Sequence, residues 1–464
     1  MAVAVTLHEV LPGEGSENED PDSTFSFYVY PKLELAESIP CPRTSASNHS
    51  CYWKQIGSDL QGPTAGDFFG ATLRLGGTAE GSRFSVTAPL YGYSQGLTQV
   101  YDVITHEDKK NTNTTYPFQQ VGTNVVGKYE DDSMQGIMAD DGYHLTMSSV
   151  DATFLGQPHV GHFGSLQISP ESKRFELYGN EMYGESSRDD FGAAVVNRDG
   201  TIVAISDVQY NKETVQDNIT NAGIVMILRY NIRSNKWNQL GQKLEGSSTD
   251  EYWGRKMALS GDGYTVIIGS RNYDSNKGKV QAYVYNSTKK EWFTLGRPII
   301  GSEIGQECGR EIELSADGKI LAVTSSCSAS NSTETNKTGF IQVFSYNEDA
   351  KEWQQMGNSI SSDQPFQSDF GYQIRSSDDG MRLAISEAKY SPTDELTSAG
   401  RVRVYDYLRE EQVWLLIGDI SGKRSCDFVG AGFDLSPDGS RLIGEIQPCV
   451  IPFSNQFPND SIFI

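Results

Sequence analysis

The sequence predicts an all-β fold, a seven-bladed β-propeller of four-stranded antiparallel blades. Two repeated signals predict it. An aromatic residue followed four positions later by glycine recurs with a period of about sixty residues, the length of one four-stranded blade. An Asp-Gly dipeptide between apolar runs, a strong hairpin signal, recurs inside the same repeats. The aromatic–glycine pairs are Trp53/Gly57, Phe118/Gly122, Phe175/Gly179, Trp237/Gly241, Trp292/Gly296, Trp353/Gly357 and Trp414/Gly418.

Each repeat carries the signals of its strands in a constant order. After the aromatic strand that starts at Trp237 come the aromatic–glycine pair Trp253-Gly254, a strand at 256–260 and the turn Asp262-Gly263. The strand after the second glycine is rich in small residues, which suits the crowded centre of a propeller. We therefore expect this strand to be innermost and the tryptophan strand to be outermost. The turns are Asp141-Gly142, Asp199-Gly200, Asp262-Gly263, Asp317-Gly318, Asp379-Gly380 and Asp438-Gly439.

The last repeat lacks an outer strand of its own. The N-terminal segment Trp53–Gly57 is expected to supply it, so that the ring is closed by an N-terminal strand and no sheet edge stays exposed. Phe25–Tyr30 and Ser461–Ile464 both look like third strands of this blade, and the sequence leaves the choice open. Residues 1–22 are expected to form an acidic, mobile lead-in. A single propeller domain is expected over 23–464, with repeats starting near 53, 118, 175, 237, 292, 353 and 414.

The composition excludes several classes of partner. The chain has 61 acidic and 38 basic residues, a formal charge of -23, so it should repel nucleic acid and anionic lipid surfaces. No apolar run approaches the length of a transmembrane segment. The first residues lack the basic and apolar regions of a secretion signal. Protein or glycan partners remain open.

The aromatic–glycine pairs, the hairpins that follow them and the apolar strands after the hairpins resemble FG-GAP repeats, the blades of integrin α-subunit propellers. Phe69-Gly70, Phe191-Gly192, Trp253-Gly254 and Phe370-Gly371 carry this resemblance, which spans about 53–464. It implies a propeller fold. The calcium loops of that family, of the type Asp-x-Asp-x-Asp-Gly, are absent, so calcium binding is not implied. The repeats are also similar to those of secreted or surface propellers of algae and other protists.

Cysteines and glycosylation sequons favour an oxidising compartment. The six cysteines fall into three local pairs, and the second and third pairs are expected at matching places in different blades, where hairpin geometry allows a disulfide. No Cys-x-x-Cys motif occurs, so a zinc site is not expected. The expected disulfides are Cys41–Cys51, Cys308–Cys327 and Cys426–Cys449. The sequons are at Asn48, Asn113, Asn218, Asn286, Asn331, Asn336 and Asn459, all in expected loops.

The sequence shows no catalytic motif. All six histidines lie at or before His162, and no nucleophile elbow, phosphate-binding loop or zinc motif is present. The candidate binding residues lie on one face, in the loops that lead into the inner strands and those that join the second and third strands. The acids can instead cap their own turns, and exposed tyrosines suit contacts with protein or glycan. These candidates are Asp67, Asp190, Glu251, Asp369, Asp427, Tyr91, Tyr93, Tyr273 and Tyr390.

The function these features favour is that of a non-enzymatic propeller that binds a protein or glycan partner, either alone or as a subunit of an assembly. We expect it to be secreted, on the cell surface or in the secretory-pathway lumen, with no cofactor, no metal and no catalytic residue. Two alternatives stay open, because the fold does not decide function. One is a hydrolase or lyase acting on polysaccharide, and the other is a purely architectural wall or surface protein.

Overall fold

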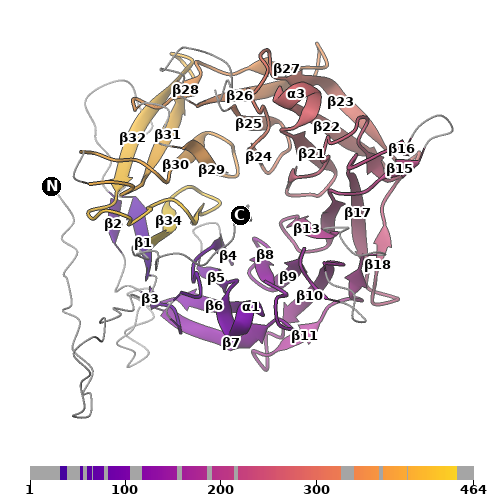
Figure 1. Ribbon diagram of the computed structural model, residues 1–464, viewed down its shortest axis with the longest axis vertical. Helices are drawn as coiled ribbons and strands as arrows, with labels where there is room; N and C mark the ends of the chain where they lie inside the picture. The colour runs from indigo at the N-terminus through magenta and orange to yellow at the C-terminus, as the bar shows by residue number, and fades with distance from the viewer. Residues whose placement is uncertain are drawn as a thin grey trace, which may run out of the picture.

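The strands form antiparallel sheets arranged around a common axis, which is the architecture of a β-propeller (Figure 1). In every sheet of four or five strands, one edge strand lies near the axis and the opposite edge strand lies at the rim. The prediction of an all-β propeller with small antiparallel blades is confirmed. The computed structural model describes residues 32–38, 53–55, 60–64, 66–77, 82–104, 118–153, 159–184, 191–213, 218–325, 339–364, 369–393 and 396–446.

Six blades are built from consecutive strands, ordered from the axis to the rim as they occur in the chain. In three of them the rim strand is interrupted, and its two pieces pair with the same third strand. The blades are β4 (Thr72–Gly76), β5 (Arg83–Ala88), β6 (Leu97–Val103) and β7 (Phe118–Val126); β8 (Gln135–Met138), β9 (His144–Ser149), β10 (His162–Ile168), β11 (Phe175–Leu177) and β12 (Met182–Tyr183); β13 (Phe191–Val196), β14 (Ile202–Asp207), β17 (Ile224–Asn231), β18 (Lys236–Gln239) and β19 (Leu244–Glu245); β20 (Lys256–Leu259), β21 (Thr265–Ser270), β22 (Lys279–Asn286) and β23 (Glu291–Ile300); β24 (Ile312–Leu314), β25 (Ile320–Ser325), β26 (Phe340–Asn347), β27 (Glu352–Gln355) and β28 (Ile360–Ser361); and β29 (Phe370–Ser376), β30 (Arg382–Glu387), β31 (Arg401–Leu408) and β32 (Val413–Ser421).

A further sheet, the composite sheet, combines strands from both ends of the chain. β33 (Phe433–Leu435) and β34 (Arg441–Ile446) are followed by β1 (Lys32–Ser38), which pairs with β2 (Trp53–Gln55) and β3 (Leu60–Gln61). The third position is thus held by β1. Phe25–Tyr30 and Ser461–Ile464, the two segments expected to compete for it, lie outside the described residues, as does the lead-in.

Two short connections need left-handed backbone. α1 (Tyr91–Ser94) and α3 (Tyr273–Asn276) are single turns whose inner residues have positive φ and are not true helices. Each joins the second and third strands of its blade. The corresponding connection after β14 instead carries a small hairpin of β15 (Lys212–Glu213) and β16 (Asn218–Ile219). These connections therefore differ from blade to blade, while the blades themselves repeat.

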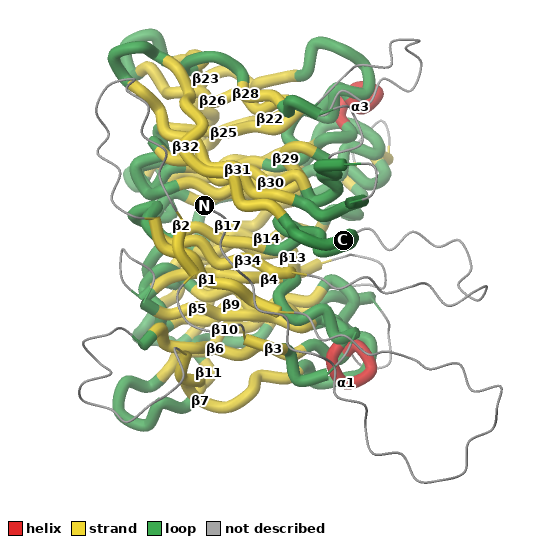
Figure 2. Tube along the Cα trace, turned by 90° about the vertical axis from the view of Figure 1, so that its left-hand side faces the viewer, coloured by secondary structure: helices red, strands yellow, loops and turns green. Residues whose placement is uncertain are grey.

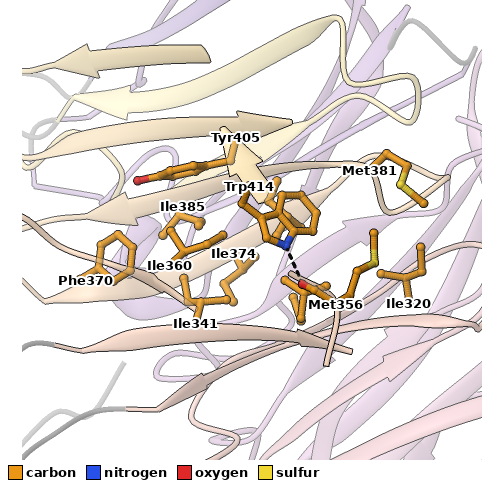
Figure 3. Close-up of a cluster of buried hydrophobic side chains, with 13 residues drawn as sticks. Ile320, Ile341, Met356, Ile360, Phe370, Ile374, Met381, Ile385, Tyr405 and Trp414 are labelled. Carbon is orange, nitrogen blue, oxygen red and sulfur yellow. Dashed lines mark hydrogen bonds between the residues drawn. The ribbon is translucent and has the colours of Figure 1, made fainter. Parts of the chain in front are cut away.

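The hydrophobic core lies between neighbouring blades. Second strands such as β30 are buried along their whole length, because a blade lies against each of their faces. The cluster in Figure 3 brings Ile341 of one blade against Ile385 of the next. This arrangement explains why the second strands are almost continuously apolar or small.

The tryptophan–glycine repeat forms a latch at the rim between successive blades. Trp414 donates its indole N–H to the carbonyl of Met356 at 3.0 Å (Figure 3), and Trp292 donates to the carbonyl of Leu240 at 2.7 Å. The residue after Leu240 is Gly241, where an added Cβ would lie 2.6 Å from the Trp292 ring. In the described part of the chain, Phe175, Trp237, Trp292, Trp353 and Trp414 each pack on the glycine of the preceding repeat, which accounts for the period seen in the sequence.

The hairpin turns between first and second strands are linked around the axis by backbone hydrogen bonds. Most of these turns repeat one local arrangement, in which a serine hydroxyl donates to the aspartate of the turn, as Ser260 does to Asp262 at 2.6 Å. The turns thereby form a continuous belt. In each bond of the belt, the backbone N–H of one turn donates to a backbone carbonyl of the next. The donor and acceptor residues are Gly77 and Asp140, Asp141 and Arg198, Arg198 and Gly261, Gly261 and Ala316, Ala316 and Asp378, and Asp378 and Pro437.

The expected Cys308–Cys327 disulfide is wrong, because Cys308 is a buried free thiol. Its backbone N–H donates to the carbonyl of Lys277, as the N–H of Trp253 donates to that of Ala222 in the preceding repeat. Cys308 therefore occupies the position of a core aromatic residue and points into the apolar cluster that contains Ile312.

Cys426 occupies a different position in its repeat. Its N–H donates to the carbonyl of Thr397, the bond that Asp250 makes in another repeat to the carbonyl of Thr220. Cys308 and Cys426 therefore occupy different positions in their repeats, and the expectation that they lie at matching places is wrong. Cys426 is one half of a disulfide. Its pairing with Cys449 stays a prediction, because Cys449 lies outside the described residues, as do Cys41, Cys51 and Cys327.

The thiol of Cys308 is expected to resist alkylation in the native protein. Burial raises its pKa to about 11, against the smaller opposite effect of a hydrogen bond with Ser325, so little reactive thiolate forms near neutral pH. Iodoacetamide labelling followed by peptide mass spectrometry checks this: Cys308 should be labelled only after denaturation, without reduction. A Cys308–Cys327 cross-linked peptide would contradict it.

Candidate functional site

The disc has two faces of different construction (Figure 2). We call one the loop face; it carries the inbound loops, which run from the rim strand of one blade to the inner strand of the next, and the return loops, which join second to third strands. Both α1 and α3 lie on this face. The hairpin turns lie on the other side, the turn face. The sequence-predicted binding residues belong to the loop face.

The predicted acids of the inbound loops mostly cap their own turns. Asp67 accepts the backbone N–H groups of Thr64 and Phe69, both at 3.1 Å. Asp427 accepts those of Lys423 and Arg424 at 2.8 and 2.9 Å. Both side chains are buried. Burial raises the pKa of Asp67, although these hydrogen bonds act in the opposite direction.

Glu251 is fully buried and combines the same capping role with an ion pair. One oxygen accepts the N–H groups of Ser247 and Ser248, and the other lies 2.7 Å from the ammonium group of Lys279. Burial alone would raise the pKa of Glu251, but the hydrogen bonds from Lys279 and Ser247 outweigh it and leave the pKa below its usual range. Asp369 pairs with Lys389 at 2.8 Å, and Asp190 lies outside the described residues.

Three predicted tyrosines begin return loops that are closed by the same hydrogen bond. The carbonyls of Tyr91, Tyr273 and Tyr390 accept the N–H of the glycine that ends each loop, at 3.2, 3.1 and 3.0 Å. Two of the rings are covered by cations. The Lys279 ammonium lies 4.6 Å from the centre of the Tyr273 ring, and the Arg401 guanidinium lies 3.8 Å from that of Tyr390. One face of each of these two rings is therefore already covered within its own blade.

Tyr93 differs, because its ring is 84 % exposed. Its carbonyl accepts the N–H of Asp131 at 3.1 Å, which joins the return loop to the next inbound loop. Leu90 and Tyr129 lie on these two joined segments and are 41 % and 42 % exposed. We call Leu90, Tyr93 and Tyr129 the aromatic patch. The sequence analysis missed Leu90 and Tyr129, because their exposure follows from how the two loops meet.

A network of charged side chains lines the axial channel. Arg74 and Arg375 reach the same oxygen of Asp434, at 3.4 and 3.0 Å. Arg198 pairs with Asp378 and lies 3.6 Å from Asp140. These residues come from the inner strands and hairpin turns of several blades, so the network links blades across and around the axis.

The carboxyl groups of the channel have raised pKa values. Burial raises the pKa of Glu313 to about 7 even though Arg375 and Arg74 favour the charged form, and it raises that of Asp140 to about 6. Buried acids of this kind are found in active sites. The cavity they line is only about 120 Å³, however, whereas ligand pockets span roughly 300–1,000 Å³. This cavity is therefore smaller than an ordinary ligand pocket.

The sequence analysis did not find these channel residues, although a signal for them exists. Arg74, Glu313 and Asp434 each stand between two leucine, isoleucine or phenylalanine residues in an inner strand. A strand alternates its faces, so a single charge between two buried residues must face the axis. That rule applies only once the inner strand is known.

The described residues contain no group of three or more His, Cys, Asp and Glu side chains placed to hold a metal ion. Within the same part of the chain, none of the helices has the length and apolar character that a membrane span requires. Among the sequon residues, Asn218 and Asn286 are described and exposed, but they lie at the ends of β16 and β22 and not in loops as expected. The other five sequon residues lie outside the described residues. Glycosylation stays a prediction.

No protein-family model matches this chain, and no curated protein sequence does. Among solved structures it is similar to the periplasmic gluconolactonase PpgL of Pseudomonas aeruginosa, with 14 % identity over 85 % of this chain and 97 % of that one and a TM-score of 0.49. It is also similar to a putative 6-phosphogluconolactonase from Bacteroides fragilis, with 14 % identity over 75 % of this chain and 98 % of that one and a TM-score of 0.38. A third similar structure is the C-terminal WD40 domain of Sif2, with 12 % identity over 82 % of this chain and 95 % of that one and a TM-score of 0.44. Identities this low carry no function from those proteins to this chain.

Proposed function

We propose that this chain is a non-enzymatic β-propeller of an extracellular or cell-surface setting that binds a partner protein through the aromatic patch on its loop face. The observation that carries the proposal is that the side chain of Tyr93 is exposed to solvent while its backbone is held by a hydrogen bond to the next inbound loop. A large exposed aromatic side chain on a fixed backbone loses little entropy on binding, which is why such residues dominate interfaces.

The turn itself does not need a tyrosine at this position. In α3 the equivalent residue is Ser275, with φ 59 and ψ 42, against φ 60 and ψ 48 at Tyr93. The carbonyls of both residues accept an N–H from the next inbound loop, at 3.1 Å for Tyr93 and 3.3 Å for Ser275. One blade therefore builds the same turn with a small polar residue, so the Tyr93 ring serves something other than the fold.

The surroundings of Tyr93 suit a protein surface. Leu90 and Tyr129 add apolar area, and the ammonium group of Lys128 lies 5.3 Å from the centre of the Tyr129 ring. An apolar centre with a charged rim is the usual composition of an interface. The enzymatic alternative finds less support: the predicted acids Asp67, Glu251, Asp369 and Asp427 are engaged in caps and ion pairs, and the channel cavity is small.

The oxidising compartment is supported by the disulfide at Cys426, since disulfides persist mainly outside the cytosol. We also infer that the composite sheet is the seventh blade and that β1, β2 and β3 close the ring. β33 contacts β29 on one side and β4 on the other, as an inner strand between two neighbours would. The Leu75 N–H also donates to the Asp434 carboxylate at 2.7 Å across this junction.

The variant Tyr93→Ser tests the proposed function, because it copies the residue that α3 already uses. We expect unchanged folding and a loss of partner affinity of tenfold or more, as for a central interface residue. Surface extract from the native source is passed over the immobilised chain, and the Kd of the retained protein is then measured after purification. Ile232→Ser is the matched control, since Ile232 is 82 % exposed but lies in the turn between β17 and β18 on the turn face.

Equal retention by wild type and Tyr93→Ser would contradict the proposal. Retention of a glycan in place of a protein, still lost in Tyr93→Ser, would keep the binding function and change the partner class. Release of sugar from polysaccharide, unaffected by Tyr93→Ser, would support the enzymatic alternative instead.

A further inference from the structure

A polar hollow is lined by the residues of α3 and by the inbound loop beside it. α3 lies on the loop face, on a different side of the ring from α1 (Figures 1 and 2). The hollow has a volume of about 490 Å³, within the range of ligand pockets. Its walls are the inbound loop around Asp250 and the return loop over 272–276. It is separate from the aromatic patch and about four times as large as the axial cavity.

Backbone bonds to neighbouring blades hold both walls of the hollow. The carbonyl of Asn276 accepts the N–H of Glu307 at 2.8 Å. On the opposite wall, the N–H of Asp250 donates to the carbonyl of Thr220 at 2.9 Å, and the Asp250 carboxylate accepts the Asn221 amide at 2.7 Å. The hollow therefore exists before any ligand arrives, which reduces the entropy cost of binding.

The lining offers hydrogen-bond acceptors and donors together. Asp250 and Asp274 present carboxylate oxygens, whereas Asn276 and the hydroxyl of Ser275 can also donate. Asn272 also lines the hollow, and its buried amide oxygen has no hydrogen-bond partner in the described part of the chain. The Tyr273 ring adds one aromatic surface.

The charges of the hollow select against ions. Two carboxylates and no cation among the lining residues disfavour phosphate, sulfate or any other anion. A cationic ligand is also disfavoured, because two acids in and beside the hollow already pair with lysines. Asp274 pairs with Lys277 at 2.6 Å, and Lys279, beside the Tyr273 ring, pairs with Glu251. A neutral ligand with many hydroxyl groups, each both donor and acceptor, matches the lining best.

We propose that this hollow binds a neutral carbohydrate, one or two sugar residues of a glycan, independently of the protein partner at the aromatic patch. Sugar hydroxyls satisfy the carboxylate and amide groups of the walls, and the Tyr273 ring offers a surface for a sugar face. This site goes beyond the proposed function, since each can exist without the other.

The experiment uses the full chain on a printed array that carries neutral, sialylated and sulfated glycans, followed by titration calorimetry with the strongest neutral oligosaccharide. We expect binding to neutral glycans only. Ser275→Tyr should weaken binding tenfold or more, because it places a ring at the hollow on a backbone that Tyr93 already shows to be compatible. Asp250→Ala should weaken it as well, because it removes an acceptor.

Tyr93→Ser is the control and should bind the neutral glycan like the wild type. Ser275→Tyr should in turn keep the protein partner, so the two sites can fail separately. Thermal melting confirms that each variant is folded. Binding confined to sialylated or sulfated glycans, no neutral glycan bound by the wild type, or equal affinity in a folded Ser275→Tyr would overturn the proposal.

Discussion

Replacing Trp292 by alanine is expected to lower the free energy of unfolding by about 3–5 kcal/mol, the usual loss for a buried tryptophan. The side chain is 3 % exposed and packs on Tyr285, with ring centres 5.3 Å apart. Its indole N–H donates to the Leu240 carbonyl at 2.7 Å. Removal leaves a cavity at the rim between two blades and an unpartnered carbonyl.

The matched control is Phe293→Ala, on the same strand with a 38 % exposed ring, which should cost less than about 1 kcal/mol. Trp292→Phe separates the two parts of the effect, since it keeps most of the packing and removes the hydrogen bond. Denaturant titration and calorimetry measure all three. A loss for Trp292→Ala no larger than that for Phe293→Ala would show that the rim latch does not stabilise the ring.

Glu313→Gln is expected to remove a pH-dependent part of the stability. The folded pKa of Glu313, about 7, lies above its usual value of 4.5 because burial disfavours the charged carboxylate. The neutral form is thus favoured by folding. The associated stability is fully present below pH 4.5 and is lost as the pH rises through 7, by about 3 kcal/mol in total.

The check is the free energy of unfolding measured by denaturant from pH 4 to pH 8. The wild type should lose more stability over this range than Glu313→Gln, and the difference between the two should grow mainly between pH 4.5 and pH 7.5. The exposed Glu291→Gln is the control and should follow the wild type. Parallel curves for wild type and Glu313→Gln would show that folding does not raise the pKa of Glu313.

The blade pattern was predictable because the same signals recur at the same spacing in successive repeats. An aromatic residue with a glycine four positions later marks the rim strand of each repeat, and Asp-Gly marks a hairpin, so strand order followed from spacing. The third strand of the composite sheet was not predictable in this way. Lys32–Ser38 pairs with Arg441–Ile446, and a partner so distant in sequence leaves no local sign that separates it from Phe25–Tyr30.

The site was less predictable than the fold. Asp67 and Glu251 recur at one place in each repeat, and recurrence fits a capping role as well as a binding role. The exposure of Tyr93 depends on which neighbours cover a ring, which spacing does not reveal. The error at Cys308 has the same origin, since its direction is set by a bond to a neighbouring blade.

The composite sheet has a consequence for how the protein is made. β1 leaves the ribosome early, whereas its partner β34 is among the last strands to be synthesised. At roughly 5–20 residues per second, the interval is on the order of tens of seconds. During that time β1 lacks its partner β34, and an unpaired strand edge is a template on which another chain can pair, so we expect association of newly made molecules to start at β1.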